Sequence, residues 1–394
     1  MKISTDDKKI NELLSRGVEN IYPKKEFLEA RLKDGKPLTL YVGYDPTAPT
    51  LHIGNGITLL KLQQFQELGH KVIFLVGDFT GMIGDPTDKL AARQQLTPEQ
   101  VSQNCALYKK QASAILNFSG DNPALVKFNG EWWGKMSAAD LLNVATHITQ
   151  QRLMERDMFQ KRLAESKPIY AHELLYPLLQ GYDSVAMEVD GEVGGNDQTF
   201  NMLVGRDLMK QFKGKEKFVL TLKLLVDDSG VKMGKTEGNM VAFSDTPEDM
   251  FGKVMRWSDG MIRGGFELCT RADVPSEKFI QAEPMKFKKM LAYEITKTFL
   301  GEEAAEQGEK NFASVIQNKE RPPVEDIPEH KLLASDSSII SVLLYSGLCS
   351  SRTEARRLLS QDGVRVNDVV ADQYTILKPG DIIQKGKRFF VKTI

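Results

Sequence analysis

The stretch from Leu38 to Asp78 decides the fold, and it reads LTLYVGYDPTAPTLHIGNGITLLKLQQFQELGHKVIFLVGD. Residues 38–45 are typical of a short β-strand, and residues 51–68 place apolar side chains at helical spacing. Residues 71–78 form a nearly continuous apolar run, as strands do when both faces of a parallel sheet are covered. Strand, loop, helix and strand make a βαβ unit, so the sequence predicts a doubly wound α/β domain.

The composition is that of an ordinary globular protein, long enough for two or three domains. The 394 residues include 52 Lys and Arg against 53 Asp and Glu, which excludes a globally basic nucleic-acid coat but leaves a local basic patch open. The apolar runs are too short to span a bilayer, and the N-terminus lacks the apolar core of a secretory signal. Three separated cysteines without a CxxC pair favour neither a disulfide framework nor a zinc site. We therefore expect a cytoplasmic protein that does not use a membrane.

The rest of the chain divides by its patterns. Residues 130–183 are mostly helical in pattern, with a capping box that begins at Ser137, and residues 218–226 resemble another strand. Residues 247–319 are helical in pattern, and the polar segment 320–330 with its three prolines is the best linker. The last 60 residues, from Ser335, contain nine Lys and Arg against six Asp and Glu, so we expect a separate, locally basic unit.

Two segments have the residue types that bind phosphates. Between the first strand and the first helix, residues 45–56 place His52 and Asn55 three apart, with glycines that let a ligand approach the backbone. Residues 232–236 (KMGKT) carry two lysines that could close over a polyphosphate. The alternatives are a turn with a solvated histidine and a solvated lysine-rich loop. The GxGxxG and Walker patterns are absent, which disfavours the usual dinucleotide and P-loop NTPase interpretations.

Three further groups of residues are candidates for binding. Tyr176, Gln180 and Asp183 share one helix face, which suits a polar ligand, although a helix–helix interface is the alternative. The segment 194–198 (GGNDQ) suits a ribose hydroxyl pair, with a plain helix cap as the alternative. Arginines on a C-terminal helix and the following strand suit an RNA-backbone surface, with a plain charged face as the alternative.

In combination these segments resemble a known family. HIGN (52–55) and KMGKT (232–236) are similar to the HIGH and KMSKS signatures of class I aminoacyl-tRNA synthetases. YVGYDPTAPTLHIGN, GDFTGMIGDPT, YPLLQGYD and GGNDQ follow in the order found in bacterial-type tyrosyl-tRNA synthetases, as does the C-terminal module. The chain departs from the pattern at Asn55, in place of the second His, and at 234–236, where Gly-Lys-Thr replaces SKS.

The resemblance implies a domain plan. A Rossmann-like, doubly wound parallel sheet would occupy residues 1–225, with a helical dimerisation insertion at about 125–180. Residues 226–319 would hold the signature loop and an all-helical domain that binds the tRNA anticodon. A linker (320–334) would lead to a small α+β RNA-binding module (335–394), similar to one in a ribosomal small-subunit protein. The family also implies a homodimer.

The resemblance also assigns roles to residues. For tyrosine, Tyr176 and Gln180 with Asp85 would bind the ammonium group, Tyr41 and Asp183 the phenol hydroxyl, and Gln198 would lie nearby. ATP would contact Gly43, Asp45, Gly54, Gly194, Asp197, Met233 and Lys235. The transition state would be stabilised by Thr47, His52, Asn55, Lys89, Arg93, Lys232, Lys235 and Thr236. tRNA would contact Arg352, Arg356, Arg357 and Arg365.

The implied reaction is the ATP-dependent attachment of L-tyrosine to tRNA(Tyr) through a tyrosyl-adenylate. Mg²⁺ would arrive on ATP, because the sequence offers no dedicated carboxylate cage and we expect no protein-bound metal. A tryptophanyl-tRNA synthetase is the nearest rival, and Tyr41 with Asp183 and the C-terminal module argue against it. The other rivals are an inactive RNA-binding paralogue, which the intact acidic and basic motifs oppose, and an RNA-modifying enzyme, which rests on the C-terminal module alone.

Overall fold

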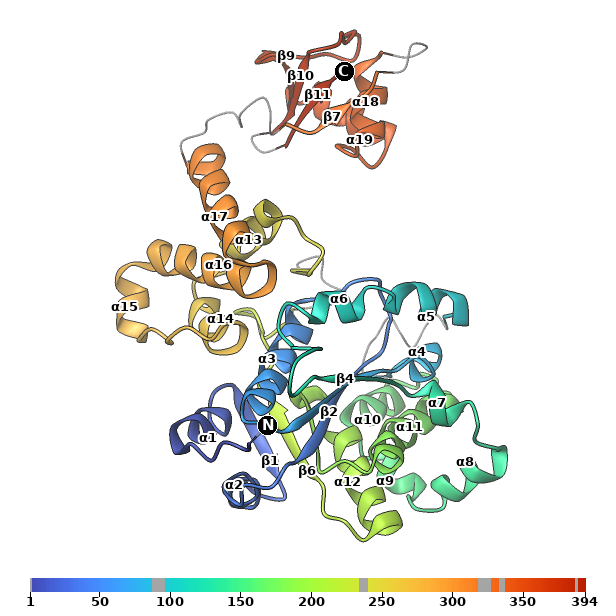
Figure 1. Cartoon of the computed structure of the whole chain (residues 1–394). Coiled ribbons are helices and arrows are strands. Elements are labelled where there is room, and N and C mark those ends of the chain that lie inside the picture. The colour runs from blue at the N-terminus through green and yellow to red at the C-terminus, as the bar shows by residue number, and fades with distance from the viewer. Residues whose placement is uncertain (1, 87–95, 234–239, 318–326, 333–336, 387–388) are drawn as a thin grey trace. The chain divides into compact units, whose positions relative to one another are not determined.

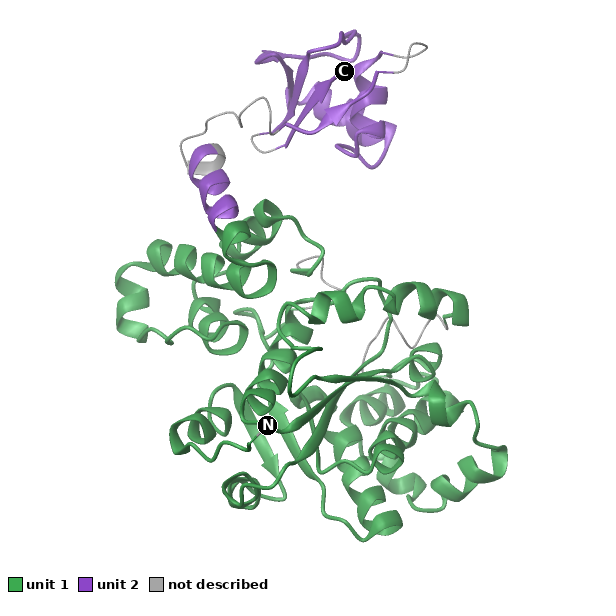
Figure 2. Ribbon diagram, viewed as in Figure 1, with its two compact units in different colours: residues 1–305 green, residues 306–394 purple. Residues whose placement is uncertain are grey.

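A computed structural model describes residues 2–86, 96–233, 240–317, 327–332, 337–386 and 389–394. The chain forms two compact units, Met1–Ala305 and Glu306–Ile394 (Figure 2). In the described part of the chain, no helix has the length and apolar character needed to cross a bilayer. Each unit has its own sheet.

The first unit is built on a six-stranded sheet. In spatial order its strands are β1 (Val18–Tyr22), β6 (Phe218–Leu222), β5 (Gly191–Gly195), β2 (Thr39–Tyr44), β3 (Lys71–Val76) and β4 (Leu125–Phe128). All neighbours pair in parallel except β1 and β6, which are antiparallel. With α3 (Ile53–Glu67) between β2 and β3, the predicted βαβ unit and doubly wound α/β class are confirmed.

The sheet reverses its winding between β5 and β2. From β2 the chain moves through α3 to β3, whereas from β5 it moves through α12 (Thr199–Lys213) to β6 in the opposite direction. Right-handed crossovers therefore place α3 and α12 on opposite faces of the sheet, as Figure 1 shows. In open α/β sheets, ligands bind beyond the carboxyl ends of the strands at such a reversal. The fold thus directs attention to the residues that follow β2 and β5.

Helices cover this sheet and extend from it. The remaining helices of the first unit are α1 (Asp7–Leu13), α2 (Lys25–Lys33), α4 (Thr80–Ile83), α5 (Pro98–Cys105), α6 (Tyr108–Ala112), α7 (Gly130–Trp133), α8 (Ala138–Ala145), α9 (Gln150–Met154), α10 (Asp157–Ala164), α11 (Ala171–Met187), α13 (Pro247–Met255), α14 (Met261–Cys269), α15 (Glu277–Ala282) and α16 (Pro284–Leu300). Helix α17 (Glu302–Asn311) spans the boundary between the units and a π-helical turn, Phe312–Gln317, follows it. The predicted capping box at Ser137 begins α8, because its hydroxyl accepts the N–H of Asp140 at 3.2 Å.

The helices after residue 247 pack within the first unit. Helix α14 lies against α3, and the guanidinium of Arg16 donates to backbone oxygens at the end of α14, including those of Phe266 (2.6 Å) and Thr270 (3.0 Å). The last carbonyl groups of a helix have no N–H donor within the helix, and the Arg16 guanidinium supplies donors for them. The helical segment expected to begin a second domain at 226 is therefore joined to the α/β part of the unit through α3 and Arg16.

One edge of the sheet differs from the sequence expectation. Residues 125–128 were expected to open the helical insertion, but they form β4, which pairs in parallel with β3 from Ile73 to Val76. The four-residue strand is half-exposed and has no alternation of apolar and polar residues, so its pairing depends on the neighbouring strand rather than on its own pattern.

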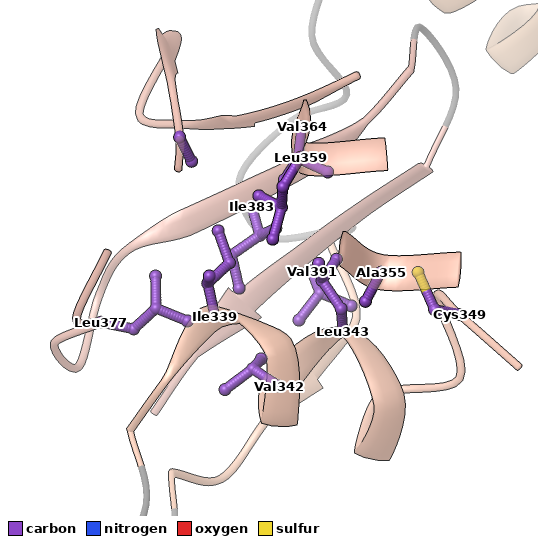
Figure 3. Packing of buried hydrophobic residues seen from close by; sticks show 11 residues of the cluster. Ile339, Val342, Leu343, Cys349, Ala355, Leu359, Val364, Leu377, Ile383 and Val391 are labelled. Atoms are coloured by element: carbon purple, nitrogen blue, oxygen red, sulfur yellow. The ribbon is translucent and has the colours of Figure 1, made fainter. Parts of the chain in front are cut away.

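The second unit contains α18 (Ile339–Tyr345), α19 (Arg352–Ser360) and a five-stranded sheet. The order of its strands is β7 (Glu329–His330), β11 (Phe389–Thr393), β10 (Ile382–Lys385), β8 (Val364–Val366) and β9 (Val369–Val370). Its core includes Ile339, Leu343, Leu359 and Ile383 (Figure 3). Within the expected linker 320–334, residues 329–330 form β7, which pairs in parallel with β11, and the carbonyl of Pro328 accepts the N–H of Lys392 at 2.9 Å.

A buried histidine predicts how the first unit responds to acid. The ring of His70 is fully buried, its Nδ1 accepts the N–H of Leu38 at 3.2 Å, and burial lowers its pKa to about 4. A histidine in the unfolded chain titrates near pH 6.5, so the neutral ring contributes stability above that pH. We expect about 3 kcal/mol of unfolding free energy to be lost as the pH falls from about 6.5 to 4.

Urea unfolding at about pH 7.5 and pH 5 measures this effect. His70→Asn retains an acceptor for Leu38 but cannot take up a proton, so the variant should lose less stability than the wild type between the two pH values. Equal losses in both proteins would contradict the assignment.

Candidate active site

A cavity of about 570 Å³ opens at the reversal between β5 and β2. Its walls contain every sequence-predicted catalytic, tyrosine or ATP residue that lies in the described part of the catalytic unit. These are Tyr41, Gly43, Asp45, Thr47, His52, Gly54, Asn55, Asp85, Tyr176, Gln180, Asp183, Gly194, Asp197, Gln198, Lys232 and Met233. Segments separated by up to about two hundred residues of sequence thus meet around one space.

The histidine motif begins helix α3. His52 is the N-cap: its Nδ1 accepts the N–H of Gly54 at 3.0 Å, and its own N–H donates to Asn55 Oδ1 at 3.0 Å. An accepting Nδ1 places the proton of a neutral ring on Nε2. The Asn55 oxygen and the His52 Nδ1 thus stabilise the start of the helix. The N–H groups of these two side chains that can donate to a phosphate are then Asn55 Nδ2 and His52 Nε2.

Asp45, at the end of β2, joins three elements of the site. Its Oδ1 accepts from Thr80 Oγ1 at 2.6 Å, and its Oδ2 accepts from the hydroxyl of Tyr176 at 2.7 Å. Burial and the adjacent carboxylates Asp45 and Asp85 raise the pKa of Tyr176 well above its ordinary value, so it keeps its proton. The pair holds helix α11 against the carboxyl end of β2.

Asp183 forms the floor of the cavity and has well-defined donors. Its Oδ1 accepts the indole N–H groups of Trp132 (2.9 Å) and Trp133 (3.1 Å), and its Oδ2 accepts from Asn129 Nδ2 (3.2 Å). Burial raises the pKa of Asp183 to about 8, while these three N–H donors act in the opposite direction by favouring the carboxylate. A ligand hydroxyl that donates to this carboxylate would meet an acceptor already held in position.

Another part of the cavity wall presents amides whose orientation is set by neighbours. Gln180 donates through Nε2 to Glu192 Oε1 at 3.1 Å, and its Oε1 accepts from Asn201 at 2.9 Å. Gln198 donates to Asp85 Oδ2 at 2.7 Å. This wall therefore offers carboxylate and carbonyl oxygens, which are acceptors suited to an ammonium group.

The buried guanidinium of Arg156 lies 3.7 Å from Asp85 Oδ1, on the same side of the cavity. It partly balances the carboxylate charge there.

Lys232 brings the second signature to the cavity. Its ammonium group lies 2.5 Å from Asp197 Oδ2, and its side chain is 49% exposed. His52 and Lys232 thus border one space, as the shared phosphate role requires. The remaining predicted residues of this group, Lys89, Arg93, Lys235 and Thr236, lie outside the described residues.

The four predicted tRNA contacts lie in the second unit. Arg352, Arg356 and Arg357 are exposed on α19, and Arg365 is exposed on β8, where its Nη1 donates to the backbone oxygen of Asp368 at 2.9 Å. Helix and hairpin thus both carry exposed guanidinium groups, as the sequence pattern predicts.

Sequence reasoning missed several residues that shape the cavity. Asn129, Trp132 and Trp133 hold Asp183, and Glu192 and Asn201 hold Gln180. The unusual NGEWW segment (129–133) was the one available signal, because adjacent tryptophans need indole acceptors when they are buried. The other residues have no local pattern that marks them.

A glycine at the carboxyl end of β3 allows this arrangement. A methyl group at Gly77 would lie 2.1 Å from Asp45 Oδ1 and 2.3 Å from Thr80 Oγ1. We expect Gly77→Ala to displace Asp45 and lower kcat/KM for amino-acid activation at least about tenfold, because small displacements of site residues are costly.

Steady-state kinetics measures this loss. The matched control is Gly252→Ala on α13, where a methyl group meets nothing within 4 Å and should leave activity unchanged. Equal activity of the two variants would contradict the role given to Gly77.

Comparisons with known proteins agree with this geometry. The family model for class I tRNA synthetases (W and Y) matches residues 33–317, and the S4 domain model matches residues 340–383. A tyrosine–tRNA ligase from Geobacter metallireducens is 41% identical over 97% of this chain and 98% of that protein. One from Syntrophotalea carbinolica is 43% identical over 96% of each.

Two solved structures are similar in fold. The tyrosyl-tRNA synthetase of Archaeoglobus fulgidus, complexed with L-tyrosine, has a TM-score of 0.60 at 21% identity and covers 77% of this chain and 99% of that one. A C-terminally truncated mitochondrial tyrosyl-tRNA synthetase from Coccidioides posadasii has a TM-score of 0.64 at 23% identity, and the match covers 77% of this chain and 91% of that one. At these identities the likeness establishes the fold alone.

Proposed function

Because this chain belongs to the tyrosyl-tRNA synthetases of class I, we propose that it attaches L-tyrosine to tRNA(Tyr) in two steps. ATP and tyrosine first form a tyrosyl-adenylate with release of pyrophosphate, and tRNA then takes the tyrosyl group with release of AMP. The single observation that carries the assignment of the site is the cavity at the β5–β2 reversal, which joins an aromatic, hydroxyl-binding floor to a cationic, histidine-containing rim.

The floor of the cavity accounts for the choice of amino acid. The substrate ammonium has three donors for the oxygens of Asp85 and Gln180 and the hydroxyl of Tyr176. The phenol hydroxyl donates to Asp183 and accepts from Tyr41. Phenylalanine lacks this hydroxyl, so Asp183 and Tyr41 would each lose one hydrogen bond in a buried site, at a cost of about 1–3 kcal/mol each. Tryptophan offers an N–H donor but no acceptor at this position, so it is disfavoured as well.

The first step needs positioned cations rather than a general base. The tyrosine carboxylate is already a nucleophile and attacks the α-phosphorus of ATP as pyrophosphate leaves. His52 would donate from Nε2 to a phosphate oxygen, and Lys232 would move from Asp197 to the phosphates as charge develops on them. Thr47, Asn55, Lys89, Arg93, Lys235 and Thr236 complete the proposed transition-state set, with Asp197 on the ribose and Mg²⁺ arriving on ATP.

The second step uses the rest of the chain. A ribose hydroxyl at the 3′ end of tRNA attacks the adenylate carbonyl, and the exposed arginines of α19 and β8 contact the RNA backbone. We propose that the enzyme works in the cytoplasm as a homodimer, with the helical insertion that ends near residue 180 at the interface. The S4 domain and the family relationship support this plan.

ATP–pyrophosphate exchange tests the function without tRNA. We expect exchange with tyrosine and at least about 100-fold lower kcat/KM with tryptophan and phenylalanine. Exchange driven by tryptophan would instead support a tryptophanyl-tRNA synthetase. A folded protein without exchange for any of the three amino acids would identify an inactive RNA-binding paralogue.

A further inference from the structure

An ion pair that the proposed mechanism does not use joins the wall of the tyrosine cavity, where Glu192 lies, to Lys217 behind that wall. Lys217 Nζ lies 2.5 Å from Glu192 Oε2, and the two side chains are 0% and 3% exposed. Gly205 on α12 leaves space for it, because a methyl group there would lie 2.7 Å from Lys217 Nζ. Apolar residues often replace a buried ion pair without loss of stability, so stability alone does not account for these charges.

One arm of the pair leads to the phenol side of the cavity. Lys217 Nζ donates to Ser184 Oγ at 2.7 Å, and Ser184 Oγ lies 3.0 Å from the hydroxyl of Tyr41. An ammonium group only donates, so the buried Ser184 proton needs another acceptor, and the Tyr41 oxygen provides it. Tyr41 therefore accepts from Ser184, and its own proton goes to an acceptor other than Ser184. Burial and a hydrogen bond to Glu192 raise the pKa of Tyr41, so that acceptor is Glu192 or a phenol oxygen in the cavity.

The other arm leads to the ammonium side. Lys217 donates to Glu192 Oε2, and a carboxylate paired with an ammonium group only accepts hydrogen bonds. Gln180 must therefore turn its NH₂ group toward Glu192 Oε1 (3.1 Å), which fixes which end of the amide is oxygen. The Gln180 oxygen is thereby left for donors, as its bond from Asn201 at 2.9 Å illustrates.

We propose that Lys217 is a positioning residue for tyrosine recognition: through Ser184 it orients the Tyr41 hydroxyl, and through Glu192 it orients the Gln180 amide. One buried cation thus sets the donor and acceptor pattern at both ends of the amino-acid pocket without contacting the substrate. The inference rests on the proposed tyrosine activation, which exchange by the wild-type enzyme tests separately.

The principal test is Lys217→Met in ATP–pyrophosphate exchange. We expect KM for tyrosine to rise at least about tenfold while kcat changes less than about threefold, because the lost interactions are binding interactions. The ratio of kcat/KM for tyrosine to that for phenylalanine should fall at least about tenfold. A purely structural role would lower activity with both amino acids alike and leave this ratio unchanged.

Two further variants separate the arms. Ser184→Ala removes the link to Tyr41 and should lower the tyrosine-to-phenylalanine ratio at least about threefold. It should leave unchanged the preference for tyrosine over 3-(4-hydroxyphenyl)propanoate, a competitive inhibitor that lacks the amino group. The double variant K217M/E192Q is electrically neutral, which favours folding if Lys217→Met alone fails, and it should lower both preferences.

Glu216→Gln is the matched control. Glu216 adjoins Lys217 in sequence and forms its own ion pair with Arg206 Nε at 2.5 Å, away from the cavity. This control should keep both preferences of the wild type. Unchanged preferences in the folded double variant, or equal losses in Glu216→Gln, would overturn the proposal.

Discussion

Replacing Lys232 with alanine is expected to lower kcat for tyrosyl-adenylate formation about 100- to 1,000-fold, with KM for tyrosine changed less than about threefold. The ammonium group lies at the cavity rim, 2.5 Å from Asp197, about half exposed and therefore able to move toward a polyphosphate. A cation that meets charge developing in the transition state affects kcat more than substrate binding. Single-turnover formation of the adenylate measures the effect directly.

Lys213→Ala is the control for Lys232→Ala. Lys213 forms an ion pair with Glu188 on the surface and has 39% of its side chain exposed, so it matches Lys232 in exposure and partner type but lies away from the cavity. Its removal should leave kcat unchanged. If Lys232→Ala raised KM for tyrosine as much as it lowered kcat, the residue would instead serve to hold the wall of the pocket.

Replacing Asp183 with asparagine is expected to lower kcat/KM for tyrosine about 100-fold and to change that for phenylalanine much less. The carboxylate accepts from both indoles and from Asn129, and the asparagine NH₂ group would face one of these donors instead of accepting from it. A hydrogen bond to a charged acceptor is worth about 1.5–3 kcal/mol, or about one to two factors of ten. Exchange should be measured at about pH 8.5, above the pKa of about 8 that burial gives Asp183.

The Asp183 prediction requires a control for general destabilisation, and Asp190→Asn supplies it. Asp190 accepts from the N–H of Thr39 at 2.8 Å and pairs with Arg31 at 3.1 Å, outside the cavity walls. This variant should lower the free energy of unfolding but keep the wild-type ratio of tyrosine to phenylalanine activity. An unchanged ratio in Asp183→Asn would refute the assignment of the phenol subsite.

The sequence predicted the strands and helices whose own residues show a strong apolar run or a clear helical spacing. The apolar run at 71–78 and the helical spacing after residue 51 are properties of single segments, and β3 and α3 form there. Strands β1 and β4 escaped prediction because each is short and partly exposed, and each becomes a strand through pairing with a distant segment. Edge strands of this kind carry little pattern of their own.

The amino-acid sequence by itself determined the signature side chains of the site, because each signature is a local set of residue types at a strand or helix end. Only the tertiary structure decided what each polar group does. Asp183 accepts from Trp132 51 residues away, Tyr176 donates to Asp45 131 residues away, and Lys217 pairs with Glu192 at the cavity wall. The physical reason is that a buried polar group must find a hydrogen-bond partner in space, and chain folding brings that partner from a segment with no sequence relation to it.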